Sequence, residues 1–585
     1  MITNEAVNGK NGVLSNGEML VYTVESEISE IRAGGFSNVP VLSAIPDFGK
    51  EYSHSNVRCN GTKYLHDIFS FRYTRTENSE KISGIFKSAR ICDRVFPYGA
   101  FIRDIETVRP FEIKISLGPW VRRSFIRGYR IGWKYFDVLH LTLPSGTSFY
   151  KCETTLRTVN AIVIVNGDAS FSESGDCVNV LRGSSRVIVV AGEGERRVKS
   201  AVAALKEDIS FDESILKNED SLSEKLLHHL LTHQSENGGV IASRNEPIVR
   251  MDSVQTIVGA FLKHARYKEA RKTLEFFCKR FEADGRFYQI YSTENGQSER
   301  YFSDVSLGCA KLMSAMLDYA RESGDSTLIK ENIKMMRSAM YAQFDECTDL
   351  TMAFSGAETE LADSLVNIKS REYASLEATL SFACATLDFC DYCEQNSIKL
   401  PHDNGSASRR ARAILDEIPN NFIINGEPSL SSADGKIKLP RFAYGDCDGC
   451  SRKFSHIYYG ELELGSDAFY TCPRCLRDRS DIVPRTDSKD GFSVLAAAIL
   501  LSNERFIKMY GEDKSRELLK RAIELRREKS DMTSVRADAL LLCVARRFGL
   551  DAEFLEREII LEAESGKLVN ERFDSKTIAS ILLVI

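Results

Sequence analysis

The hydrophobic pattern of the chain changes near residue 210. Before that point, short apolar runs alternate with polar residues and are separated by Gly, Asn and Ser, as in MLVYTVES, SFRYTRTE, FDVLHLTLPSG, NAIVIVNG and SRVIVVAGEG. A period of two indicates antiparallel strands with one buried face. Residues 1–210 are therefore predicted to form an N-terminal antiparallel β-sandwich domain.

From SLSEKLLHHLLTH (221–233) onward, apolar residues recur at helical spacing. The pattern predicts helices over 221–233, 252–265, 267–282, 304–322, 326–342, 372–395, 406–417, 491–509, 513–528, 533–548, 552–564 and 574–584. Pairs of helices joined by short turns favour an array that closes into a solenoid or toroid. The fold class is thus multidomain α+β, with an (α/α)6 toroid domain over 211–585.

Composition narrows the function and the location of the chain. Its 585 residues are too many for one ordinary core, and its formal net charge of -6 argues against a nucleic-acid binder driven by bulk positive charge. The start has no basic region followed by an apolar run, and no apolar stretch reaches the length of a membrane span. We expect a cytoplasmic protein with no nucleic-acid or membrane partner, and the oligomeric state stays open.

Acidic residues stand at or before the starts of three successive predicted inner helices. Asp252 and Asp304 begin two of them, and Glu358 and Glu360 precede the third in the segment MAFSGAETEL. In a closed toroid these starts lie on one rim, so the acids would converge on one cavity. The alternative is that Asp252 and Asp304 are N-caps, which helix starts favour for reasons of stability, and that the two Glu residues are solvated.

The most specific local motif is CDGC…CPRC, which contains Cys447, Cys450, Cys472 and Cys475. Two C-x-x-C segments separated by a loop supply four thiolates, a donor set that suits structural Zn2+. Residues 440–480 are therefore predicted to be a zinc-ribbon insertion within the toroid domain. Acidic residues dilute its basic cluster, so a flap over the toroid rim is favoured over a reader of nucleic acid.

The other cysteines are predicted to be reduced. Most are single residues in apolar surroundings, such as Cys278, Cys309, Cys384 and Cys543, in a chain of 15 cysteines with no secretory signal. A second C-x-x-C, in LDFCDYCEQ, lies inside a predicted helix and has no matching pair. It is interpreted as part of the helix surface and core, with no metal or redox role.

Two segments carry a resemblance to a known family. IVRMDSVQTIVGAFLKHARYKEARKTLEFF, and SGAETEL followed by REYASLEATLSF, resemble the six-hairpin (α/α)6 glycosidases, in particular the glucoamylase-like group with an N-terminal β-sandwich. The chain also resembles uncharacterised bacterial members of this superfamily that carry a Cys-rich insertion. The resemblance implies that Arg250 and Asp252 hold sugar hydroxyls, with Asp304 assigned to substrate binding on the same rim. It implies that Glu358, or failing that Glu360, is the general acid.

The expected function is a glycoside hydrolase that acts on α-linked glucosides or short oligosaccharides by carboxylate general acid/base chemistry. The general base is not assigned among Asp487, Asp490, Asp531 and Asp574, which all lie near late helix starts. Two alternatives stay open. One is a disaccharide phosphorylase on the same fold, and the other is a non-catalytic carbohydrate-binding or scaffold protein, because no Trp follows Trp133 and the base is unplaced.

Overall fold

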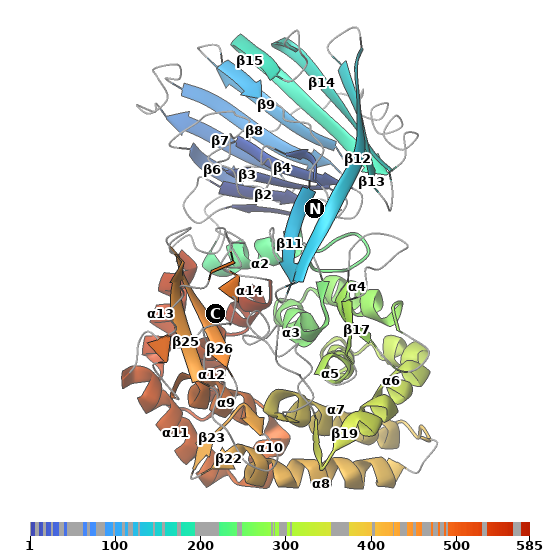
Figure 1. The fold of residues 1–585 in the computed structure, drawn as a ribbon, viewed down its shortest axis with the longest axis vertical. Coiled ribbons are helices and arrows are strands. Elements are labelled where there is room, and N and C mark those ends of the chain that lie inside the picture. Colours follow the sequence, from blue (N-terminus) through green and yellow to red (C-terminus); the bar gives the residue numbers. More distant parts are fainter. Residues whose placement is uncertain are drawn as a thin grey trace.

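The computed structural model describes strands in the first 193 residues and a mostly helical array after residue 221 (Figure 1). Up to that point it describes β1 (Ile2–Glu5), β2 (Asn11–Ser15), β3 (Met19–Val24), β4 (Glu27–Ala33), β5 (Pro40–Ser43), β6 (Thr62–His66), β7 (Phe71–Glu77), β8 (Ser88–Phe96), β9 (Ala100–Thr107), β10 (Phe111–Lys114), β11 (Val121–Ile126), β12 (Tyr129–Leu143), β13 (Thr147–Thr154), β14 (Thr158–Phe171) and β15 (Cys177–Glu193). Beyond them it describes residues 221–242, 249–281, 285, 287–291, 301–304, 307–352, 374–400, 404–424, 426–432, 441–447, 452–458, 470–471, 478–479, 485–486, 490–528, 535–564 and 575–585.

The strands form two antiparallel sheets. One has five strands in the order β1-β2-β3-β4-β5, and the other follows the path β11-β12-β13-β14-β15-β9-β8-β7-β6, with β10 paired to β15. The five alternating runs of the sequence coincide with β3, β7, β12, β14 and β15, so their prediction as strands is confirmed. Strand β3 contacts β9, and β4 contacts β15. The division at residue 210 and the two-sheet sandwich as a domain stay predictions.

The helices lie where the apolar period predicts them. Among the described residues they are α2 (Leu222–Thr232), the short 3-10 helix η2 (Met251–Ser253), α3 (Val254–Lys263), α4 (Tyr267–Cys278), α5 (Leu307–Ser323), α6 (Thr327–Glu346), α7 (Leu376–Gln395), α8 (Asn404–Phe422), α9 (Asp490–Leu501), α10 (Glu504–Tyr510), α11 (Glu512–Glu528), α12 (Val535–Arg547), α13 (Glu553–Glu564) and α14 (Ser575–Leu582). The single helix predicted over 491–509 is wrong. Asn503 ends it, because its side chain accepts hydrogen bonds from the first backbone N–H groups of α10.

Six of the helices form a closed inner ring. Each contacts the next in the order α3, α5, α7, α9, α12, α14, and α14 contacts α3 again. Each inner helix also packs against an outer helix: α4, α6, α8, α11, α13 and α2 cover them in the same order. The ring closes through the two ends of the helical region, since α2 precedes it in the chain and α14 ends it (Figure 1). The predicted toroid of six hairpins is thereby the observed fold.

Inner helix α9 is apolar on nearly all sides because both of its faces are covered. In α9, the eight residues from Val494 to Leu501 are all buried. A helix that is hydrophobic all round is stable only inside a core. The outer helices show the other pattern, in which one apolar stripe faces the ring: α11 buries Leu518, Leu519 and Ile523 between charged residues.

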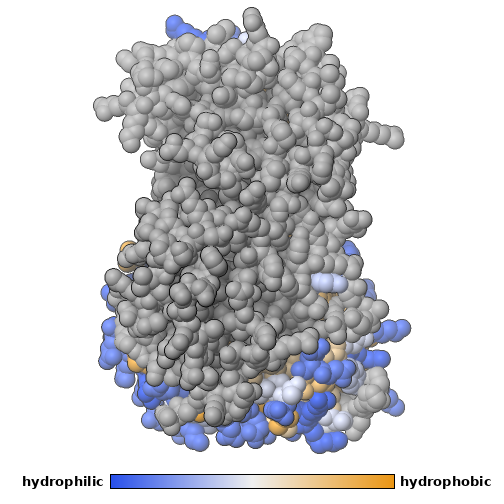
Figure 2. All heavy atoms as spheres, viewed as in Figure 1, coloured by the Kyte–Doolittle hydropathy of each residue, from blue (hydrophilic) through white to orange (hydrophobic). Residues whose placement is uncertain are grey.

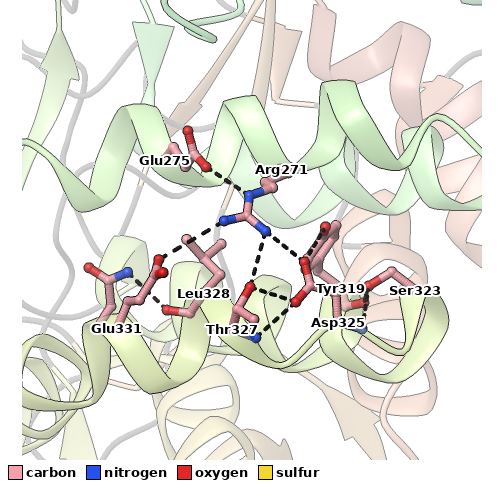
Figure 3. A network of polar contacts seen from close by, with 9 residues as sticks. Arg271, Glu275, Tyr319, Ser323, Asp325, Thr327, Leu328 and Glu331 are labelled. Atoms are coloured by element: carbon pink, nitrogen blue, oxygen red, sulfur yellow. Dashed lines mark hydrogen bonds and ion pairs between the residues drawn. The ribbon is translucent and has the colours of Figure 1, made fainter.

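A polar network on the outer side connects two neighbouring hairpins (Figure 3). Arg271 of α4 contacts Glu275 on its own helix at 2.8 Å and Asp325 at 2.6 Å. Asp325 lies in the turn between α5 and α6, next to Gly324, whose positive φ of 71° suits a residue without a side chain. The carboxylate of Asp325 also accepts from Thr327 N–H at 2.9 Å, which holds the start of α6. This is one of the short turns that the sequence predicts between paired helices.

A second network joins three late helices and is far more buried. The guanidinium of Arg526 (α11) donates from Nε to Asp538 (α12) at 2.7 Å and from Nη2 to the other oxygen at 2.9 Å. It also contacts Glu558 of α13. Two parallel bonds from a guanidinium fork fix the orientation of both side chains. The network therefore sets how outer helix α11 packs against the following hairpin.

The described surface of the helical part is mostly hydrophilic on the face shown in Figure 2. Among the described residues, the large hydrophobic side chains that are exposed are Tyr267 and Leu561. No helix within the described ranges combines the length and the apolar character needed to cross a membrane.

Cys543 is exposed, so its predicted apolar setting is wrong, whereas Cys309 and Cys384 are buried as predicted.

Replacing Arg526 should destabilise the helical part much more than replacing its neighbour. In Arg526→Met, the carboxylate of Asp538 is left buried without its cation, which costs about 3–5 kcal/mol of unfolding free energy. The matched control is Arg527→Met on the same helix, where the side chain is more than half exposed and its ion pair with Asp551 spans 3.8 Å. We expect a loss within about 1 kcal/mol there. Urea unfolding followed by circular dichroism measures both, and equal losses would contradict the assignment.

Candidate functional site

The chain enters the first two inner helices through one small sheet. Strands β16 (Val249–Arg250), β17 (Phe287–Tyr291) and β18 (Tyr301–Asp304) pair in that order, with Arg250 opposite Ile290 and Asp304 opposite Phe287. Strand β16 leads through η2 into α3, and β18 leads toward α5. The backbone thus brings the sequence positions of Arg250, Asp252 and Asp304 to the same end of the ring. The prediction that Asp304 begins a helix is wrong, because it ends β18 and α5 begins at Leu307; its side chain lies outside the described set.

Asp252 is held in an ion pair inside the ring. Its Oδ2 lies 2.5 Å from Nζ of Lys576, the second residue of α14, and both side chains are buried. The N-cap position of α3 belongs to Ser253, whose hydroxyl donates to the backbone oxygen of Arg250 at 2.6 Å. The interpretation of Asp252 as a simple N-cap is therefore wrong: its carboxylate connects the first hairpin of the ring to the last helix.

Glu377 is the second buried carboxylate of the site. Its Oε1 lies 3.3 Å from Nζ of Lys311 (α5) and 3.3 Å from Nη2 of Arg536 (α12). Glu377, Arg536 and Lys576 are each the second residue of their helix, and Asp252 lies in the turn before α3. The described side chains that converge here thus come from the N-terminal ends of four inner helices and from the second turn of α5.

These contacts place the charges on the axis of the ring. In the ring order, α9 lies between α7 and α12, so the contact from Arg536 to Glu377 passes across the inside of the ring. Lys576 also acts electrostatically on Glu377 although α14 and α7 are three positions apart, on opposite sides of the ring. Side chains from opposite helices can meet only near the axis. We call these five residues, Asp252, Lys311, Glu377, Arg536 and Lys576, the axial cluster.

One donor of the axial cluster has no acceptor among the residues that the structure describes. Nη1 of Arg536 is buried and makes no hydrogen bond, whereas Nη2 contacts Glu377. Leaving a buried donor unsatisfied costs about 1–3 kcal/mol. Arg536 and Lys576 are also cations at helix N-termini, where the helix dipole opposes them by about 0.3–1 kcal/mol each. These features of the axial cluster therefore lower the free energy of unfolding in ways that a purely structural role does not explain.

Burial and mutual attraction shift the pKa values of the axial cluster. Burial acts to raise the pKa of Glu377, but Lys311, Arg536 and Lys576 outweigh it and lower this pKa to about 2. Burial, assisted by Arg536, lowers the pKa of Lys576 to about 8 in spite of Asp252 and Glu377. Glu377 is thus ionised throughout the neutral range and too weakly basic to accept a proton there. It serves as a counterion, so a general acid must be sought elsewhere.

Glu358 and Glu360 lie outside the described residues. The described chain on either side of them ends at the same rim: Met352 of β20 (Thr351–Met352) donates its N–H to Oγ1 of Thr379 in the first turn of α7 at 3.0 Å. On the other side, β21 (Ala374–Ser375) leads directly into α7, so the predicted start of that helix near Arg371 is wrong by several residues. Among the candidates for the general base, Asp490 is the first residue of α9, and Asp487, Asp531 and Asp574 are not described.

The Cys-rich insertion contains two short antiparallel hairpins. In the first, β25 (Arg441–Cys447) pairs with β26 (Arg452–Tyr458), with Cys447 opposite Arg452. In the second, β27 (Tyr470–Thr471) pairs with β28 (Asp478–Arg479). Each C-x-x-C therefore belongs to the connection at the end of one hairpin. The structure does not describe Cys450, Cys472 or Cys475, and within its described residues no group of metal-binding side chains occurs.

The insertion returns the chain to the ring. Strand β29 (Arg485–Thr486) pairs with β25 only four residues before α9 begins. The second C-x-x-C, Cys390 and Cys393, lies in α7 as predicted, and burial raises the pKa of these thiols to about 12 and about 11. Thiols with such values are not nucleophiles at neutral pH.

Sequence analysis singled out Arg250 and Asp252, whose role in substrate binding stays a prediction. It missed four residues of the axial cluster: Lys311, Glu377, Arg536 and Lys576. A signal exists in the pattern: Glu377 in SLEATLSF and Lys576 in SKTIASILLVI interrupt otherwise apolar inner helices. A charged residue on a helix that is buried on all sides must find a partner. The period of the apolar residues alone does not tell such a residue from a solvated first turn.

Comparison with solved structures places this fold. A putative kojibiose phosphorylase from the human microbiome has a TM-score of 0.52 at 10% identity, over 99% of this chain and 86% of that one. A bacterial glucoamylase complexed with acarbose has a TM-score of 0.48 at 10% identity, over 89% and 87%. A rhamnosidase from Klebsiella oxytoca with rhamnose bound has a TM-score of 0.40 at 9% identity, over 90% of this chain and 87% of that one. No family model and no curated protein matches the sequence. The first similarity shows that the chain has the six-hairpin (α/α)6 fold.

Removing the charge of Glu377 should destabilise the protein in a pH-dependent way. Because its pKa is lowered in the folded state, ionised Glu377 stabilises the fold above about pH 4.5, and this contribution is lost as pH falls toward 2. We expect Glu377→Gln to lose about 3–5 kcal/mol at pH 7, since three cations lose a shared partner, and to lose less at pH 3. Denaturant unfolding at both pH values measures this.

The matched control for that experiment is Glu394→Gln, near the other end of α7. Its side chain is exposed, so its removal should change the unfolding free energy by no more than about 0.5 kcal/mol at either pH. A Glu377→Gln variant that is as stable as this control would show that the axial cluster does not hold the ring together.

Proposed function

We propose that this chain is a carbohydrate-active enzyme, a glycoside hydrolase for α-linked glucosides or short oligosaccharides. The observation that carries the proposal is the convergence of buried charged side chains on the axis, at the helix starts of a closed six-hairpin ring. The hairpin pattern of the sequence predicts this convergence of helix starts. The fold similarity to a putative kojibiose phosphorylase supports the same class of enzyme, although a fold alone does not fix an activity.

The proposal assigns the general acid and the general base to separate carboxyl groups. Glu358 donates a proton to the glycosidic oxygen, with Glu360 as the second candidate. One of Asp487, Asp490 and the other late carboxylates activates water on the opposite face of the sugar. This division suits the axial cluster, in which Asp252 pairs with Lys576 and Glu377 is a counterion whose pKa is lowered to about 2.

Arg250, Asp252 and Asp304 would bind sugar hydroxyls at the rim. A carboxylate offers about four lone-pair sites, so the ion pair of Asp252 with Lys576 still permits it to accept from a hydroxyl. The pairing sheet of β16, β17 and β18 holds the backbone of Arg250 and Asp304 in fixed register. Such fixed register supports the proposal that both residues belong to one substrate-binding surface.

A disaccharide phosphorylase is the second candidate. The solved structure that matches over 99% of this chain bears the name of a putative phosphorylase, and the axial cluster is rich in cations. A non-catalytic carbohydrate-binding or scaffold protein is the third, and it differs from both by lacking turnover. Adding or omitting phosphate in an activity assay separates the first two.

Turnover should depend on Glu358. We expect the native protein to release glucose or a sugar phosphate from at least one α-linked di- or oligosaccharide, and Glu358→Gln to lower kcat by about a hundredfold or more with little change in sugar binding. Glu360→Gln tests the second candidate from the same segment and should retain most of the activity if Glu358 is the acid. Product release is measured by chromatography with and without phosphate. Full activity in Glu358→Gln would remove that residue as the acid, and no turnover on any sugar would favour the binding protein.

We also propose that Cys447, Cys450, Cys472 and Cys475 hold one structural Zn2+. The placement of each C-x-x-C at the end of a two-stranded hairpin supports this, because such turns can present two thiolates to one metal ion. The ion would stabilise a small segment that has little core of its own. It would not take part in the sugar chemistry.

The purified protein should contain about one zinc per chain by plasma emission spectrometry. Cys472→Ser should lower this content strongly, because a four-thiolate site loses one ligand, whereas the control Cys390→Ser in α7 should leave it unchanged. A zinc content that is unaffected by Cys472→Ser would contradict the site.

A further inference from the structure

The axial cluster contains more positive than negative charge. Among the described residues, Lys311, Arg536 and Lys576 supply three cations, whereas Asp252 and Glu377 supply two carboxylates. The five side chains are between 3% and 16% exposed. Water therefore screens these charges poorly, and the five described side chains together carry an excess of one positive charge.

The backbone adds to this excess. The axial cluster lies at the N-terminal ends of α7, α12 and α14, where unpaired backbone N–H groups carry partial positive charge. A cation is the least favoured residue type at such a position, yet Arg536 and Lys576 both occupy the second residue of their helices. A helix N-terminus and a buried cation both favour a negatively charged partner.

A second observation, independent of the charge count, is that the guanidinium of Arg536 has a hydrogen-bond donor that no described residue satisfies. Its side chain is 7% exposed, and its contact with Glu377 uses Nη2 only. Nη1 is buried and has no acceptor among the residues that the structure describes. The contrast is Arg526, whose guanidinium is equally buried but makes two parallel bonds to Asp538. Arg526 is satisfied by the protein, and Arg536 is left with a donor on the axis of the ring.

We propose that the axial cluster binds a small oxyanion, a phosphate or a carboxylate, with Arg536 as its principal donor and Lys311 and Lys576 as flanking cations. A planar guanidinium with a free N–H suits an oxyanion in geometry as well as in charge. Bound there, the anion would neutralise the excess charge and satisfy Nη1.

This inference deepens the proposed function, because the anion would belong to the substrate side of the reaction. It has two possible sources. Free phosphate would take the place of water: one phosphate oxygen forms a bond to the anomeric carbon, the glycosidic bond breaks with its electron pair on the leaving oxygen, and that oxygen takes the proton of Glu358. Alternatively, the anion is a carboxylate or phosphate group on the sugar and serves for recognition alone.

Calorimetric titration of the full chain with inorganic phosphate tests the site. Ionic strength is held constant with sodium chloride, and glucuronate and neutral glucose are titrated in parallel. We expect saturable binding of phosphate or glucuronate by the native protein, weakened about tenfold or more in Arg536→Gln. The matched control is Arg547→Gln at the other end of α12, whose side chain is 39% exposed and pairs with Glu504, and it should bind as the native protein does.

The source of the anion is read from the same titrations. Phosphate binding without glucuronate binding identifies a co-substrate, and tighter glucuronate binding identifies an acidic sugar. If Arg536→Gln fails to fold, Lys311→Gln replaces it, because that side chain is less buried and lies on α5.

Absence of saturable binding of both anions to the native protein, or equal binding by a folded Arg536→Gln variant, would overturn the inference. Binding is measured without turnover, so its outcome is separate from that of the proposed function. A protein that binds phosphate but cleaves no sugar would keep the anion site and lose the enzyme. A protein that hydrolyses neutral glucosides but binds neither anion would keep the proposed enzyme activity and lose the anion site.

Discussion

The ion pairs on the axis of the helix ring depend on the ring being closed. Lys576 lies in α14 and Asp252 lies just before α3, 324 residues away in the chain, and Arg536 reaches Glu377 across 159 residues. An open ring would separate these pairs, and any of these charges that stayed buried without its partner would cost several kcal/mol. The start of α14 is also held by Ser575, whose N–H and hydroxyl donate to backbone oxygens of Ala242 and Ile241 at 2.7 and 2.6 Å. Closure and charge pairing therefore stabilise each other.

The sequence predicts the elements well because local physics determines them. Helical spacing of apolar residues identified all the segments of the ring, and alternation identified the five strands, since each pattern follows from one buried face. Errors occur where a non-local partner decides. Asp304 belongs to a strand because β17 offers it a pairing partner, and the helix predicted over 491–509 divides at Asn503, where a side-chain cap competes with the helical bond.

The residues of the candidate site also fall into those that local sequence indicates and those that only the fold brings together. Arg250 and Asp252 were singled out because their position before an apolar helix is visible in a short stretch of sequence, and their role in substrate binding stays a prediction. Lys311, Glu377, Arg536 and Lys576 were not singled out, because each is an ordinary charged residue near a helix start until the ring brings it to the axis. Only the combination of an apolar helix and a charge in its first two turns indicates burial, and it identifies no partner. The closed ring supplies the partners.

The axial cluster also constrains where acid chemistry can occur. A carboxyl group within about 6 Å of uncompensated cations has its pKa lowered by about 1–3 units and becomes a poor proton donor at neutral pH, as Glu377 illustrates. A general acid near this centre therefore needs either distance from the cations or a negative charge beside them. The proposed oxyanion would supply that charge: it would neutralise Arg536 and its neighbours, and its own negative charge would raise the pKa of a nearby carboxyl. On this argument the anion would do more than bind, because a carboxyl beside it would keep its proton to a higher pH and could donate it.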